Sequence, residues 1–142
     1  MTVIERFASY LVDLRLDRLA GDERAILVDH LIDTVGASVA GAHSTDGRAV
    51  LAFDPRTTLA GTGRPRSADP LDALALRVAA TRSTEVDDIH MASCTTPGAI
   101  VIPTALSVAA GRPDVTGAEF GAAILAGYEA MTRLGTAIGG AA

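Results

Sequence analysis

The chain has 142 residues, of which 49% are hydrophobic, and a formal net charge of −5 at pH 7. This length predicts a single domain, residues 1–142, and the apolar content is sufficient for a core. All 12 basic residues are arginines and they form no cluster, which argues against nucleic-acid binding. Without lysine, the chain has no side-chain amine for a Schiff base or for lysine acid–base chemistry.

The cysteine content and the apolar stretches indicate in which cellular compartment the protein is expected. The single Cys94 excludes an intrachain disulfide and is typical of a reducing environment. The N-terminal residues carry Glu5 and Asp13 within their apolar pattern and lack the features of a signal peptide. The most apolar stretch, residues 97–111, contains Pro103 and is shorter than the roughly 20 residues of a membrane span. We therefore expect a soluble, cytoplasmic protein with no membrane contact.

Two helices are predicted in the first third of the chain. Apolar residues spaced by three or four predict a helix over residues 2–16. A second helix is predicted from Asp22 as N-cap to Gly41. Its apolar positions are expected to contact neighbouring helices, and they comprise an i, i+4 ridge widened by two isoleucines: Leu27, Leu31, Val35, Val39, Ile26 and Ile32.

In the middle of the chain, the residue pattern predicts a short helix around residues 48–53, followed by at most one short strand near residues 57–60. Glycine and proline residues follow as a turn. A helix is predicted from Pro70, because proline is tolerated at a first helical position. The fold class predicted for the whole chain is an all-α helical bundle.

Two further helices are predicted near the C-terminus. Thr96 and Pro97 offer an N-cap and a first-turn proline, and Pro103 predicts either a kink or a helix that begins only there. Thr116 and Glu119 form a capping-box pattern, which predicts a last helix running to about residue 138.

Polar chemistry is concentrated in residues 83–99, STEVDDIHMASCTTPGA. Glu85, Asp87 and Asp88 crowd the end of a predicted helix, where the helix dipole is already negative, and such crowding raises carboxylate pKa values. This arrangement indicates a functional site. The structural alternative is that the acids are solvated or pair with Arg82, and that Asp88 caps a turn.

Other residues of this stretch are also candidates. His90 is a candidate base, whereas His30 is expected on the surface or at a helix contact. Asp87, His90 and Cys94 are too few for a known zinc pattern, so we expect no metal. Hydroxyl groups beside the helix N-terminus are suited to hold a substrate carboxylate, unless Thr96 simply caps the helix; these groups belong to Ser93, Thr95 and Thr96.

Five stretches, which follow one another along the chain in the family's order, resemble motifs of the MmgE/PrpD family, which includes 2-methylcitrate dehydratase and cis-aconitate decarboxylase. LVDHLIDTVGASVAGA resembles the family's early helix, and EVDDIH resembles its D-x-D-D-T-H motif. TPGAIVIPTALSVA is similar to HPG-x-x-x-x-P-A-x-L-A, and GYEAMTRLGTAIG is similar to GYE-x-x-x-R-x-G. The stretch LAGTGRPRSADPLDALALRVAATRSTEVDD resembles the strand, turn and helix before the acidic motif.

The resemblance implies a role for individual residues. Glu85 falls where the family has an active-site aspartate, Asp87 and Asp88 match the paired acids, and His90 matches a histidine of some members. Thr96 stands where characterised members have a histidine thought to be catalytic, and Ile89 replaces a threonine.

The resemblance also implies an activity. Family members act on small di- and tricarboxylic acids by dehydration, decarboxylation or isomerisation, without metal or organic cofactor. Their active site lies between a helical domain and a smaller lid. We expect the chain to supply the first part of the helical domain, without the lid, as a homo-oligomer or with a second chain that supplies it. His90 or Glu85 would then be the general acid–base. The alternative is a non-catalytic binding or assembly module that kept the helical scaffold.

Overall fold

The computed structural model describes residues 1–53 and 70–139, and in these ranges it contains six α-helices and no β-strand. This confirms the all-α prediction; the strand expected near residues 57–60 lies outside the described residues. The elements are α1 (Val3–Val12), the 3₁₀ turn η1 (Leu16–Arg18), α2 (Gly21–His43), α3 (Thr45–Ala52), α5 (Pro70–Arg82), α6 (Pro97–Ala110) and α7 (Gly117–Ala137).

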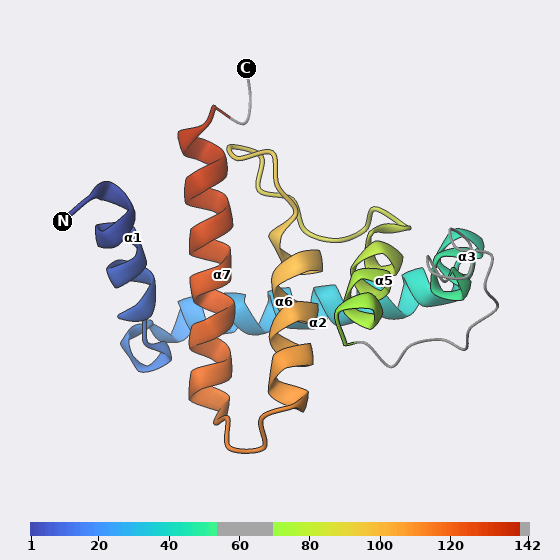
Figure 1. The fold of residues 1–142 in the computed structure, drawn as a ribbon, viewed down its shortest axis with the longest axis horizontal. Helices are drawn as coiled ribbons and strands as arrows, with labels where there is room; N and C mark the ends of the chain where they lie inside the picture. Colours follow the sequence, from blue (N-terminus) through green and yellow to red (C-terminus); the bar gives the residue numbers. More distant parts are fainter. Residues whose placement is uncertain (54–69, 140–142) are drawn as a thin grey trace.

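The helices form two layers. Helices α6 and α7 lie side by side as an antiparallel pair, with α1 outside α7 and with α5 and α3 beyond α6, while α2 crosses behind them (Figure 1). The core lies where α2, α6 and α7 meet. It is built around Val101, Ile102 and Ile124, against which Leu27 and Leu31 of α2 pack.

The helix starts follow local capping chemistry. The predicted box at Thr116 and Glu119 is present, and its two reciprocal hydrogen bonds begin α7. Helix α2 begins two residues earlier than expected, with Ala20 rather than Asp22 as N-cap. Helix α6 begins at Pro97 and includes Pro103, so the alternative of a start near Pro103 is wrong.

The apolar ridge predicted on α2 is only partly buried. Leu27 and Leu31 pack on the core, but Val35 and Val39 are exposed, as are Ile26 and Ile32. An i, i+4 ridge rotates by about 40° at each step, because four residues exceed one turn of 3.6. The buried stripe instead continues through Thr34, Ala37 and Gly41.

Two helix ends also differ from the prediction. The first helix ends at Val12, and its Ile4 is exposed, because α1 packs mainly on α7 and buries no residue fully. Helix α2 continues past Gly41 to His43. Gly41 is needed where α2 meets α5, since a Cβ there would lie 1.9 Å from the backbone oxygen of Ala80.

Helix α2 is also long and apolar enough to cross a membrane, judged by length and composition alone. Core helices of soluble proteins pass the same test, and one face of α2 packs on α5 and α6.

Candidate functional site

The polar segment predicted from the sequence connects α5 to α6 and lies near one end of the α6–α7 pair (Figure 1). An isolated antiparallel bridge joins His90 to Thr95 and closes a tight turn between them. Cys94 in this turn and Glu85 before it both have φ of 51°, a left-handed conformation that is uncommon outside glycine. Such backbone conformations persist only where the surrounding contacts hold them.

Asp87 is held in an ion pair inside the protein. Both carboxylate oxygens accept hydrogen bonds from Nη1 of Arg82 at 2.7 Å, and the Asp87 side chain is 0% exposed. The bond to Asp87 raises the pKa of Arg82 above its ordinary value. Glu85 lies 3.9 Å from the same guanidinium, but its side chain is 82% exposed. The pairing with Arg82 that the sequence left open therefore occurs.

Asp88 connects three helices. Its Oδ1 accepts the backbone N–H of Gly98 at 2.8 Å, and its Oδ2 accepts the hydroxyl of Tyr128 at 2.7 Å. Nδ1 of His30 lies 3.3 Å from Oδ2. Thr96 occupies the N-cap position of α6, but its side chain makes no capping bond. Asp88 therefore caps α6 in its place, at the positive end of the helix dipole.

The surroundings of Asp88 are closely packed. Thr34 is 1% exposed, and a Cβ on Gly98 would lie within 2.7 Å of the Thr34 Oγ1, Asp88 Oδ1 and Tyr128 hydroxyl oxygens. Burial, and then the bond to Asp88, raise the pKa of Tyr128 well above its ordinary value of 10.0. The rings of His30 and Tyr128 lie 5.0 Å apart between centroids. Glycine at position 98 thus allows three polar groups to meet against α6.

His90 belongs to a second, separate group. Its Nδ1 lies 2.8 Å from Oγ of Ser93, and Ser93 Oγ lies 2.7 Å from Oγ1 of Thr95. Ser93 is 3% exposed, so this contact fixes the imidazole from the protein side. Helix α7 approaches this turn at Gly135, where a Cβ would lie 2.6 Å from Cβ of Ser93.

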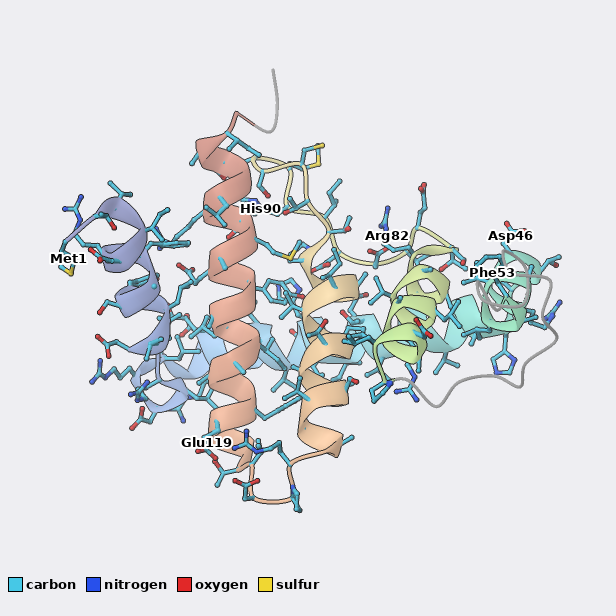
Figure 2. All side chains as sticks on the ribbon, viewed as in Figure 1. Met1, Asp46, Phe53, Arg82, His90 and Glu119 are labelled. Carbon is cyan, nitrogen blue, oxygen red and sulfur yellow. The ribbon has the colours of Figure 1, made fainter. Side chains whose placement is uncertain are left out.

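His90 lines a cavity of about 630 Å³ between α1 and α7. Figure 2 shows His90 near the end of α7, whereas Arg82 lies apart at the end of α5. Apart from His90, the cavity is lined by apolar side chains of α1 and by polar and apolar side chains of α7: Val3, Ile4, Phe7, Glu129, Thr132, Arg133, Leu134, Thr136 and Ala137.

Arg133 is the cationic group of this cavity. Its Nε donates a short hydrogen bond to Glu129, and its Nη2 donates to the Tyr10 hydroxyl at 3.3 Å. The bond to Glu129 raises the pKa of Arg133. Burial acts to raise the pKa of Glu129, but the hydrogen bonds from Tyr10 and Arg133 outweigh it and lower that pKa overall.

The structure thus divides the predicted residues into separate groups. No direct hydrogen bond or ion pair joins any two of Glu85, Asp87, Asp88 and His90 in this described segment. Ser93 and Thr95 hold His90, while Thr96 begins α6. Across the described ranges, no three His, Cys, Asp or Glu side chains are placed to hold a metal.

Three residues of these groups were not predicted from the sequence. His30, which was expected on the surface or at a helix contact, lies beside Asp88, and Tyr128 and Arg133 face the two groups from α7. The signal available was the motif GYEAMTRLG, whose tyrosine and arginine are these two residues.

Comparison with known proteins supports the family resemblance. Residues 5–142 match the sequence profile of the MmgE/PrpD N-terminal domain. Searches among curated proteins and among solved structures gave no significant match. The profile covers nearly the whole chain, and the all-α fold agrees with it. The chain therefore belongs to the MmgE/PrpD family, as its N-terminal domain.

Proposed function

We propose that the protein is part of a lyase or isomerase that removes a proton next to a carboxylate of a small di- or tricarboxylic acid. The observation that carries this proposal is that His90 and Arg133 line the same cavity. An imidazole and a guanidinium are the groups that such a reaction needs, one to accept the proton and one to bind the carboxylate. Loss of water or CO₂, or isomerisation, would follow the proton transfer.

His90 is the proposed general base. Because Ser93 holds its Nδ1, the ring has Nε2 as the nitrogen for proton transfer. Arg133 already binds Glu129 and Tyr10, which orient its guanidinium beside the cavity. Glu85 remains a second candidate acid–base at the solvent-exposed side of the segment. Asp87 and Asp88 support the segment through Arg82 and through the start of α6.

The proposal also assigns supporting roles to two threonines and specifies the cofactor, the compartment and the partner chain. Thr95 acts through Ser93 on His90, and Thr96 shapes the turn before α6. We propose that no metal or organic cofactor takes part, that the protein works in the cytoplasm, and that a second chain supplies a lid over the cavity. The exposed, free thiol of Cys94 suits a reducing compartment.

A specific observation favours the alternative, a non-catalytic scaffold. Asp87 and Asp88 are both engaged in contacts inside the fold, and Thr96 cannot act as the histidine that the family places there. In this case the segment serves to join α5, α6 and α7. The cavity beside His90 would then hold no substrate.

Hydrogen exchange at the carbon next to a carboxylate distinguishes the lyase or isomerase from the non-catalytic scaffold. The protein, alone and co-expressed with a lid-domain chain, is incubated in D₂O with di- and tricarboxylic acids, and ¹H NMR follows loss of the C–H signal next to a carboxylate. We expect exchange that falls by about 10²–10⁴-fold in His90→Ala. Arg133→Ala should raise the KM for the acid, whereas the matched Arg112→Ala, between α6 and α7, should not. Absence of exchange in every preparation favours the scaffold.

A further inference from the structure

Helix α1 lies outside α7 (Figure 1) and forms one wall of the cavity that His90 lines. Within residues 1–53 and 70–139, every hydrogen bond between α1 and another helix involves Tyr10. Phe7 and Leu11 are the partly buried residues of α1, and none of its residues is fully buried. The contacts of the Tyr10 hydroxyl therefore have a large share in holding this wall against α7.

The Tyr10 hydroxyl lies between an acidic and a basic side chain of α7. It donates to Oε2 of Glu129 at 2.6 Å and accepts from Nη2 of Arg133 at 3.3 Å. The bond to Glu129 raises the pKa of Tyr10, so the hydroxyl keeps its proton at neutral pH and its oxygen remains the acceptor for Arg133. Nε of Arg133 donates to the same oxygen of Glu129. We call the two contacts of this hydroxyl the Tyr10 latch.

A carboxylate that binds Arg133 through two hydrogen bonds must take Nη2 from Tyr10. A guanidinium presents two edges to a carboxylate, one formed by Nε and Nη2 and the other by Nη1 and Nη2. Both edges contain Nη2, which is the nitrogen that donates to Tyr10. On the first edge, the incoming anion also displaces Glu129 from Nε. On either edge, the latch loses a contact and Glu129 acquires a second negative charge close to it.

We propose that binding of a carboxylate at Arg133 releases α1 from α7, so that the cavity beside His90 opens when an acid enters it. The cavity wall that moves carries Val3, Ile4 and Phe7. The inference rests on the proposed function only in requiring that Arg133 binds a carboxylate. Because binding free energies are coupled reciprocally, release of α1 must in turn strengthen carboxylate binding.

Amide hydrogen exchange in the presence of succinate or citrate tests the release. Sodium chloride of equal ionic strength is the reference, because salt alone weakens exposed ion pairs. We expect either acid to speed exchange in residues 3–12 about fivefold, as for the loss of one hydrogen bond, and to leave residues 97–110 unchanged. The NMR signal of the Arg133 Nε–H reports binding in the same samples.

Two variants separate the latch from general loosening of α1. In Tyr10→Phe, exchange in α1 should already be fast without succinate, and succinate should speed it little further. The affinity of Arg133 for succinate should rise about fivefold in this variant, because no hydroxyl has to be displaced. Val12→Ala changes an exposed apolar residue of α1 and keeps the latch, so it should respond to succinate as the wild type does.

The outcomes distinguish failure of this inference from failure of the proposed function. A shift of the Arg133 signal with unchanged or slower exchange in α1 would overturn the inference and leave the proposed function standing. No shift with either acid would overturn both the inference and the role of Arg133 as the carboxylate site. Faster exchange in α1, together with no C–H exchange of the acids in D₂O, would support the latch and reject the lyase or isomerase.

Discussion

The hydroxyl of Tyr128 donates a hydrogen bond of 2.7 Å to Oδ2 of Asp88, and so joins α7 to the segment that begins α6. The same carboxylate accepts the N–H of Gly98 and lies beside His30 of α2. One side chain therefore fixes the junction of the three helices that form the core. Removing any partner of Asp88 should lower the free energy of unfolding more than it changes the local structure.

Tyr128 should keep its proton up to the pH at which the protein unfolds. Burial and the bond to Asp88 raise its pKa in the folded state above the unfolded value near 10. This contribution to stability is complete below about pH 10 and is lost as the pH rises above it, because only the unfolded state then ionises. In Tyr10→Phe, which leaves Tyr128 as the single tyrosine, phenolate absorbance at 295 nm should appear only together with loss of helical circular dichroism.

The chain suits this measurement, since it has neither lysine nor tryptophan. As a reference, the same variant in urea should titrate near pH 10. A reversible titration near pH 10 with the helices intact would show that Tyr128 is not held as described.

Arg82→Ala should destabilise the fold by about 3–5 kcal/mol, because it leaves the buried carboxylate of Asp87 without a partner. Asp87→Ala should cost less, since the freed guanidinium of Arg82 is 35% exposed and can reach water. Urea unfolding followed by circular dichroism gives both values. Arg112→Ala, which breaks an exposed pair with Asp114, is the matched control and should change stability by less than about 1 kcal/mol. Equal costs for Arg82→Ala and Arg112→Ala would refute the buried pair.

Asp88→Ala should destabilise α6, whereas Thr96→Ala should have little effect. Loss of a capping side chain costs about 0.5–2 kcal/mol, and here the Tyr128 hydroxyl also loses its acceptor. Thr96 occupies the usual cap position without making the bond. Hydrogen exchange of the first turn of α6, together with urea midpoints, separates the two variants. A larger loss of stability in Thr96→Ala than in Asp88→Ala would show that Thr96, rather than Asp88, caps α6.

Local patterns predicted most of the fold, because caps and apolar spacing act within a few residues. The capping box at Thr116 and Glu119 is confirmed, and the start of α6 at Pro97 is one of the two alternatives that the local pattern allowed. The exposure of Val35 and Val39 on the α2 ridge is not predictable in this way, since an i, i+4 pattern does not reveal which side of the helix has a neighbour. Burial of Val35 depends on which helix lies beside it, and this is a property of the tertiary fold.

The candidate site was predicted as one cluster and is arranged as separate groups. Sequence proximity placed Asp87, Asp88 and His90 together, but their side chains have different partners. Those partners come from distant parts of the chain, with Tyr128 lying 40 residues from Asp88. Spacing along the sequence cannot show such contacts, although the pairing of Asp87 with Arg82, five residues away, was among the alternatives.

Gly41→Ala should be strongly destabilising, although alanine favours helix by about 1 kcal/mol over glycine. The new Cβ would lie 1.9 Å from the Ala80 oxygen and 2.8 Å from its carbonyl carbon, so that α2 and α5 must separate. Gly117→Ala is the matched control, because a Cβ at this first position of α7 meets nothing within 4 Å. Thermal unfolding should show a lower Tm for Gly41→Ala alone. An unchanged Tm would mean that the α2–α5 contact is not as close as described.

Tyr10→Phe should loosen α1 and leave the rest of the fold intact. Helix α1 buries no residue fully, and the Tyr10 hydroxyl donates to Glu129 of α7 at 2.6 Å while the ring lies 5.1 Å under the Arg133 guanidinium. Removing the hydroxyl costs about 1 kcal/mol for an exposed bond of this kind, equivalent to about fivefold faster amide exchange in residues 3–12. Phe7 of the same helix, which lines the cavity, offers a matched site: Phe7→Leu keeps the hydrogen bond of Tyr10 and should speed exchange less. Exchange in α6 should not change, because the core cluster around Ile102 contains no residue of α1. Uniform protection of α1 in both variants would show that packing, rather than the Tyr10–Glu129 bond, holds this wall of the cavity.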